Sequence, residues 1–277
     1  MKKQDSLHQK RVWEIDALRG ALMFFVLLHH IYLMLSAACI DSPFSNFDAA
    51  SFVSKIDPFG ILFTVDDGSN IQRGFYGMVY NYTYKLGVDL FFIISGISYK
   101  FSRSSFKNAM RLLVGAVFVS GFTKLLQLYT GDETQFIRFG ALHCYALCHL
   151  IYYYFLAERN NKVLFLAALV SLAAGYCLMQ NPIYSNLALL VPFGIAERGV
   201  PYRDYWPVFP MLGWFLIGIV LGRKYYREKV SLFPKQEGKK WHKPLCFLGR
   251  HSGLIYCGHM VVYSLVFIGI GYIFALY

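Results

Sequence analysis

Long apolar runs, separated by short polar segments, dominate the chain. At about 1.5 Å per helical residue, a run of roughly 20 residues crosses the ~30 Å hydrocarbon core of a bilayer. The runs predict transmembrane helices near residues 17–38, 79–101, 106–127, 138–157, 163–180, 204–223 and 250–276. We therefore expect an all-α polytopic membrane protein, a helical bundle of about seven transmembrane helices that forms a single domain over residues 1–277.

One further stretch, residues 183–197, is apolar enough to suggest an eighth crossing. Pro192 and Gly194 interrupt it, and a full crossing there would place the strongly cationic tract 223–243 outside the cell. The stretch is therefore predicted to be a short re-entrant or outer-leaflet segment.

The cationic residues predict an orientation. The chain has a net charge of +11, and most of its Lys and Arg residues lie in short segments beside the apolar runs. Because cytoplasmic loops are enriched in Lys and Arg, residues 1–11, 100–111, 159–162 and 223–243 are expected inside. The N-terminus is then cytoplasmic and the C-terminus outside. The charge reports orientation and not nucleic-acid binding, and the tract 223–243 is expected to be a solvated loop beside anionic lipid.

Composition supports the membrane class: 56% of the residues are hydrophobic and 16% are charged. The six cysteines lack the paired spacing of a metal site, so they are interpreted as packing residues and no metal is predicted.

A charged stripe enters the first apolar run. Arg19 and His30 are eleven positions apart, so on a helix they lie within about 20° of each other and about 16 Å apart along the axis. Asp16 lies on the same stripe, one turn before Arg19. Ionisable groups inside a bilayer are costly and usually face a polar pathway or a partner.

Two more histidines, His143 and His259, are expected near the depth of His30, and Asp89 enters the second run from the outside. A single buried histidine is more often an interhelical hydrogen-bond partner than a catalyst, but three at similar depth favour a functional interior. For Asp89, an ion pair with Arg138 near the outer face is an equal alternative.

Several motifs resemble a known family. The run Glu14-Ile-Asp-Ala-Leu-Arg-Gly20, followed by His30, and the run 86–97 are similar to motifs of membrane-bound acyltransferases. The runs 138–143, 204–213 and 247–259 narrow the resemblance to bacterial proteins related to the heparan-α-glucosaminide N-acetyltransferase catalytic domain. The motifs occur in order over most of the chain.

The resemblance implies transfer of an acetyl group from cytoplasmic acetyl-CoA to an amine or hydroxyl of an extracytoplasmic glycan. His30 would be the general base or a transiently acetylated nucleophile. His143 and His259 would polarise the thioester or orient His30, and Asp89 would stabilise the imidazolium. The residues assigned to the donor site are Arg11, Asp16, Arg19, Arg103, Lys107 and Arg250, with Asp16 acting through Arg19.

The sequence departs from the lysosomal members of the family. In those members an Asn occupies the position of His30 and the essential histidine lies further along, whereas this chain has no histidine between His30 and His143. Catalysis is therefore expected to fall on His30, and segment 39–78 is where an acceptor surface is expected. A proton- or anion-coupled transporter or flippase is the alternative function, and a homodimer is left open.

Overall fold

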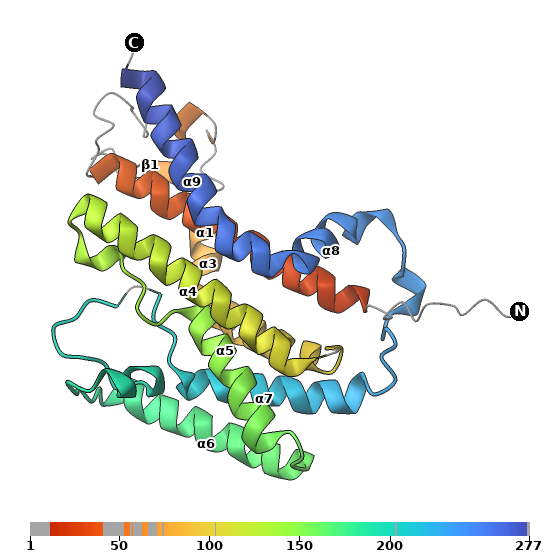
Figure 1. The fold of residues 1–277 in the computed structure, drawn as a ribbon. Helices are drawn as coiled ribbons and strands as arrows, with labels where there is room; N and C mark the ends of the chain where they lie inside the picture. The colour runs from red at the N-terminus through yellow and green to blue at the C-terminus, as the bar shows by residue number, and fades with distance from the viewer. Residues whose placement is uncertain are drawn as a thin grey trace, which may run out of the picture. The chain divides into compact units, whose positions relative to one another are not determined.

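The computed structural model describes residues 12–40, 53–55, 57, 63–65, 71–73, 75–102, 104–202 and 204–275. The described part is predominantly helical (Figure 1). It divides into two compact units. Unit 1 comprises Met1–Asp16 and Asp89–Trp241, and unit 2 comprises Ala17–Val88 and His242–Tyr277.

The main helices are α1 (Trp13–Ile40), α3 (Phe75–Tyr99), α4 (Ser105–Thr130), α5 (Ala141–Ile151), α6 (Asn161–Gln180), α7 (Val208–Tyr225), α8 (Lys243–Arg250) and α9 (Ser252–Ala275). Short elements join them: η1 (Glu133–Gln135), the π-helix η2 (Tyr152–Leu156), η3 (Ala188–Phe193), η4 (Pro234–Gln236) and η5 (Lys240–His242). Strands β1 (Phe63–Val65) and β2 (Ile71–Arg73) pair antiparallel. This small hairpin lies in the segment 39–78 and is an addition to the expected all-α architecture.

Each predicted transmembrane segment overlaps at least one of these helices. Within the described residues, four stretches are long and apolar enough to cross a membrane: Trp13–Tyr32, Ser105–Tyr129, Asn161–Gln180 and Val208–Tyr225. Three shorter apolar helical stretches, Leu86–Tyr99, Ala141–Leu156 and Ser252–Val266, match the remaining predicted segments. The chain is thus an integral membrane protein, and a total of seven crossings stays a prediction.

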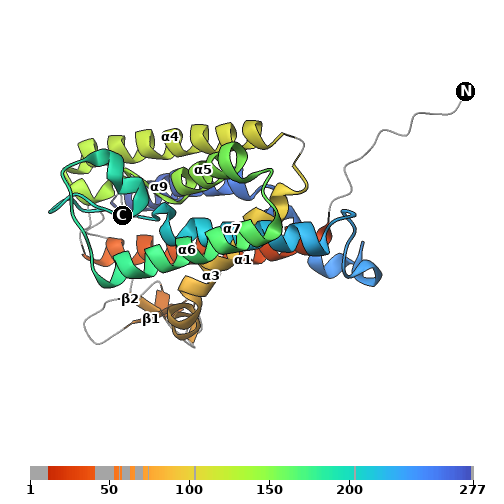
Figure 2. The same cartoon turned by 90° about the horizontal axis from the view of Figure 1, so that it is seen from below.

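Small residues allow the helices of unit 1 to approach closely. A Cβ added to Gly218 of α7 would collide with the backbone carbonyl of Ile93 on α3, and one added to Gly96 would collide with the carbonyl of Phe215. On another face of α7, a Cβ at Gly213 would lie 2.8 Å from the carbonyl oxygen of Ala168 in α6. Helices in lipid associate through such close contacts because lipid supplies no hydrophobic drive between them. Figure 2 shows α6 and α7 running side by side.

The stretch 183–197 forms no helix of spanning length. It contains only the six-residue 3₁₀ helix η3, which has Pro192 inside it and ends at Gly194 with φ of 100°. The hydroxyl of Tyr205 donates to the carbonyl of Val191 at 2.6 Å and ties this segment to the start of α7. The prediction of a short, non-spanning element is consistent with this geometry.

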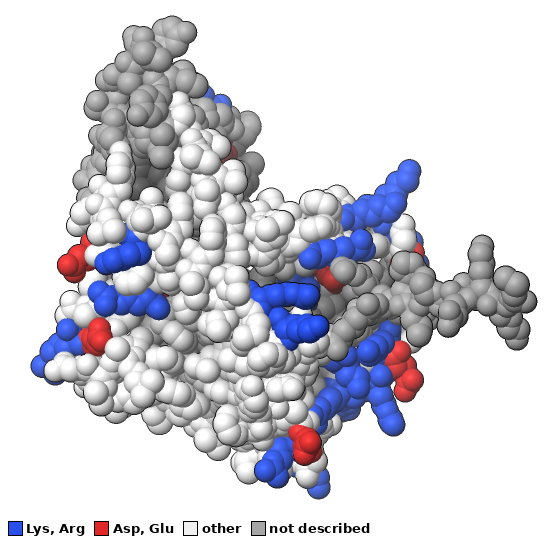
Figure 3. All heavy atoms as spheres, viewed as in Figure 1, with Lys and Arg blue, Asp and Glu red and all other residues white. Residues whose placement is uncertain are grey.

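Charged side chains of unit 1 gather at the two ends of its long helices. On the face drawn in Figure 3, the surface between these ends is formed by other residues. Such a band is typical of a surface that faces lipid.

Candidate active site

Two histidines of the predicted set lie in contact within unit 2. The rings of His30, on α1, and His259, on α9, have centroids 4.6 Å apart and planes inclined by 71°, an edge-on arrangement. His259 is 6% exposed. The structure therefore brings together the two histidines that helix arithmetic placed at similar depth.

Backbone contacts fix the protonation pattern of both rings. Nδ1 of His30 lies 2.8 Å from the carbonyl oxygen of Val26, and Nδ1 of His259 lies 2.8 Å from that of Tyr256. A carbonyl oxygen only accepts hydrogen bonds, so Nδ1 is the donor in each ring, and in its neutral form each ring has its lone pair on Nε2. Nε2 of His259 is buried and has no hydrogen-bond partner among the described residues.

Aromatic side chains surround the pair. The ring of Tyr263 lies edge-on to His259 at 5.7 Å, and that of Tyr256 lies 5.6 Å from it. The Tyr263 hydroxyl donates to the carbonyl of Leu27 at 3.3 Å, which links α9 to α1. His29 lies 5.5 Å from His30. These ring and hydrogen-bond contacts pack around the two imidazoles and hold them in place.

Two arginines of the predicted donor site flank a close helix crossing in unit 2. A Cβ on Gly20 of α1 would collide with the carbonyl of Leu245 in α8 and would lie 3.0 Å from the nitrogen of Gly249. Arg19 and Arg250 are the chain neighbours of these glycines, so the crossing brings two guanidinium-bearing positions near each other. Arg19 is half-buried and Arg250 is exposed.

The other donor-site candidates belong to unit 1 or fall outside the described residues. Asp16 is buried near the start of α1, one turn before Arg19. Lys107 is exposed in the first turn of α4, and its backbone N–H donates to the hydroxyl of Ser104. Arg11 and Arg103 lie outside the described residues.

His143 is engaged locally in unit 1. The backbone N–H of Gly140 donates to its Nδ1 at 3.2 Å, so the proton is on Nε2, which lies 3.3 Å from the hydroxyl oxygen of Ser120. That hydroxyl donates in turn to the carbonyl of Ile137 at 2.7 Å. Both ring nitrogens therefore lie within hydrogen-bonding distance of groups near the start of α5. A catalytic role of His143 stays a prediction.

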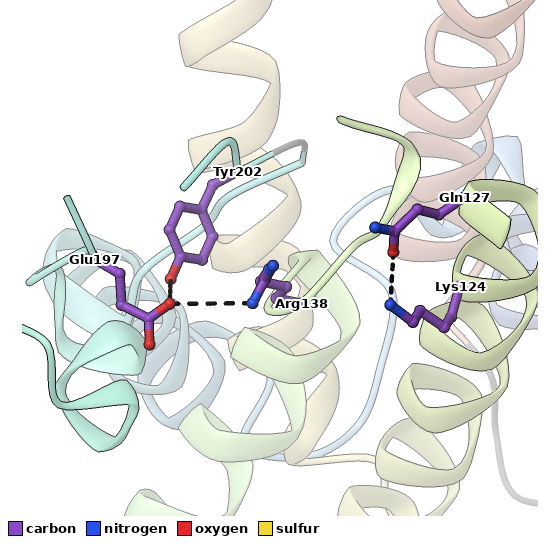
Figure 4. Close-up of polar contacts among 5 residues, drawn as sticks. All are labelled: Lys124, Gln127, Arg138, Glu197 and Tyr202. Atoms are coloured by element: carbon purple, nitrogen blue, oxygen red, sulfur yellow. Dashed lines mark hydrogen bonds and ion pairs between the residues drawn. The ribbon is translucent and has the colours of Figure 1, made fainter. Parts of the chain in front are cut away.

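Asp89 is half-buried on α3 and belongs to unit 1. Arg138, its alternative partner from the sequence, lies 4.0 Å from the carboxylate of Glu197. Glu197 also accepts a hydrogen bond from the hydroxyl of Tyr202 at 3.3 Å (Figure 4). Burial raises the pKa of the Tyr202 phenol, so it stays a donor at neutral pH.

The sequence reasoning missed a buried histidine on α5. His149 of α5 is 6% exposed, its Nε2 lies 3.2 Å from the hydroxyl of Ser95 on α3, and its ring lies 4.8 Å from Phe215 of α7. The sequence feature that could have indicated its burial is its position beside Cys148, inside an apolar run. Its position joins three helices of unit 1.

No group of three or more His, Cys, Asp or Glu residues in the described part of the chain is placed to hold a metal ion. Imidazole can act as a base in its neutral form, and guanidinium groups are suited to binding phosphate.

Comparison with known protein families identifies the family of this chain. Residues 58–261, well over half of the chain, match the family described as heparan-alpha-glucosaminide N-acetyltransferase, catalytic. The chain belongs to this family. The resemblance drawn from five sequence motifs is confirmed, and the family indicates a membrane-bound transferase. The matched range includes His259 and Arg250 and begins after α1. No curated protein and no solved structure matched the chain.

Proposed function

We propose that this member of the heparan-α-glucosaminide N-acetyltransferase catalytic family moves an acetyl group from cytoplasmic acetyl-CoA to an amine or hydroxyl of an extracytoplasmic glycan. The observation that carries the proposal is the contact between His30 and His259. The proposal is supported by these two imidazoles, each with Nδ1 directed at a backbone carbonyl, on apolar helices of a chain whose family is described as an N-acetyltransferase.

His30 is the proposed general base. Its Nε2 takes the proton from the acceptor as the acceptor nitrogen or oxygen attacks the thioester carbonyl carbon. The tetrahedral intermediate collapses by breaking the C–S bond, and CoA leaves as a thiolate that takes the proton back from the imidazolium. His259 supplies a second imidazole in contact with the one that becomes charged, and the Tyr256 carbonyl keeps its proton on Nδ1.

A covalent route uses the same residue. In that route Nε2 of His30 attacks the thioester, CoA departs, and the acetyl-imidazole then acylates the acceptor. Rapid acid quench of enzyme mixed with labelled acetyl-CoA, without acceptor, separates the two routes. Acetyl label on His30 supports the covalent route, and its absence during normal turnover supports direct transfer.

The donor is proposed to bind at the cationic end of the helices. Arg19 and Arg250 lie at the α1–α8 crossing, and guanidinium groups form paired hydrogen bonds with phosphate. Arg11, Arg103 and Lys107 are the further candidates, and Asp16 is assigned to orient Arg19. His143 and Asp89 remain proposed members of the site, and seven crossings with the N-terminus inside complete the proposed topology.

The test compares donor binding with turnover in purified protein. Acetyl-CoA titrated by calorimetry should bind saturably, and CoA lacking its 3′-phosphate should bind more weakly. The variant His30→Asn keeps a donor for the Val26 carbonyl but loses Nε2, so transfer should fall about 10²–10⁴-fold with unchanged binding. Normal transfer by His30→Asn would remove His30 from the chemistry. Folded protein that binds no acyl-CoA would favour the transporter.

A further inference from the structure

The segment 226–241, called here the α7–α8 connection, follows directly from the end of α7 and is packed onto the start of α1 in unit 1. Glu14 accepts hydrogen bonds from the hydroxyl of Ser231 at 2.8 Å and from the backbone N–H of Leu232 at 2.7 Å. The indole N–H of Trp13 donates to the carbonyl of Phe233 at 3.2 Å. Hydrogen bonds between residues more than 200 positions apart in the chain therefore hold this connection against α1.

These contacts place the connection at the edge of the membrane. Tyr225 is the last residue of one candidate span, and Trp13 is the first residue of another. Phe233 bonds to Trp13, and the ring of Trp241 lies edge-on to Trp13 with centroids 5.8 Å apart. Phe233 and Trp241 consequently lie at the level where a membrane helix begins, which is where tryptophan is enriched.

Several apolar side chains of the connection are exposed, while one of its hydroxyls and one of its backbone amides bond to Glu14. Leu232, Phe233 and Trp241 are 48%, 58% and 60% exposed, whereas Glu14 takes up the neighbouring hydroxyl and amide. Beside it, Tyr226 is buried, and burial together with the Glu14 carboxylate raises its pKa to about 12. The tyrosine therefore remains protonated at all physiological pH values.

Cations are interleaved with these apolar side chains. From residue 224 to residue 241 the exposed basic residues are Lys224, Arg227, Lys229, Lys235, Lys239 and Lys240, against the acidic residues Glu228 and Glu237. Apolar and aromatic side chains mixed with cations are typical of elements that lie in the headgroup region and bind anionic lipid.

We infer that the α7–α8 connection is an interfacial anchor, which inserts Leu232, Phe233 and Trp241 into the leaflet at this end of α7 and binds anionic phospholipid headgroups through its lysines. This inference is independent of the proposed reaction. The sequence alone predicts a solvated loop beside anionic lipid for the tract 223–243, and the inference adds that its apolar side chains insert into the leaflet.

The test reconstitutes the full chain in phosphatidylcholine vesicles with and without phosphatidylglycerol. The contribution of Trp241 to the tryptophan fluorescence is the part that disappears in the variant Trp241→Phe. Lipids that carry bromine on their acyl chains near the headgroup should quench this contribution. Quenching of that part by aqueous iodide, with none by brominated lipid, would overturn insertion.

A charge-reversal pair tests the headgroup contacts. The double variant Lys239→Glu with Lys240→Glu should lower the affinity for phosphatidylglycerol at least about tenfold, because each basic residue near the surface contributes about 1 kcal/mol to the binding of anionic lipid. Native mass spectrometry measures this affinity. Lys124→Glu with Arg198→Glu makes the same charge change at exposed positions outside the α7–α8 connection and should retain the affinity.

Equal loss in both pairs would contradict the inference. Displacement of phosphatidylglycerol by inorganic phosphate or acetyl-CoA would also overturn it, because the cations would then bind a soluble anion. If the reversal pair does not fold, Phe233→Ser takes its place and should lose the brominated-lipid signal of Trp241.

Discussion

At the scale of single residues, the two contacting histidines differ from a third histidine with the same backbone interaction. His251 also has Nδ1 2.9 Å from a carbonyl four residues earlier, that of Phe247, but it is exposed and lies outside the pair. The substitution His→Asn keeps a side-chain N–H donor at each position while removing Nε2. Comparable replacements at His259 and His251 therefore isolate the contribution of the pair.

We predict that His259→Asn lowers kcat about 10²–10⁴-fold with little change in KM for acetyl-CoA, because the second imidazole of the pair is lost. His251→Asn should leave both constants near those of the unchanged protein. Steady-state kinetics on matched preparations measures both variants. A similar loss in the two would mean that His259 matters for folding and not for transfer.

The histidine pair could be anticipated in part. Helix geometry gives the depth of His30 and His259 along their axes, but it does not say that α1 and α9 are neighbours, since that depends on the contacts of Tyr263 and Leu27 between helices. The local bonds of His143 depend on the chain turn at Gly140 and on Ser120 of another helix. Neither leaves a signal in a linear pattern.

At the scale of elements, the apolar runs predict the helices well and their ends less well. The expected start at residue 204 is wrong by four residues. Asp204 has φ of 53°, and its carboxylate accepts from the indole of Trp206 at 2.7 Å and from the backbone N–H of Ala141 at 3.3 Å. The carboxylate thus stabilises the start of α5, where a negative charge is favourable, and α7 begins only at Val208.

Close packing of α7 against α3 leads to a prediction of stability. Gly218→Ala should destabilise the protein by about 1–3 kcal/mol, since the added methyl group meets the backbone of Ile93, which can move only with its helix. Gly121→Ala is the matched control: nothing lies within 4 Å of its Cβ position on α4, and alanine favours the helix by up to about 1 kcal/mol. Thermal unfolding in detergent compares them, and equal midpoints would contradict the proposed helix contact.

At the scale of the whole molecule, the expected sides of the membrane rest on charge and on one helix of spanning length, α7. Residues 181–207 precede α7 and residues 226–241 follow it, so a single crossing by α7 puts the two segments on opposite sides. The cations of the α7–α8 connection favour the cytoplasmic side.

Cysteine labelling tests this orientation. In a chain whose six native cysteines have been replaced, Arg198→Cys should react with an impermeant maleimide on intact cells, whereas Lys239→Cys should react only after permeabilisation. Both positions are exposed, so their reactivity reports the side of the membrane. Reaction of both on intact cells would mean that α7 does not cross. The reversed pattern would place the α7–α8 connection outside, and acetyl-CoA could then not reach Arg250 from the cytoplasm by the proposed route.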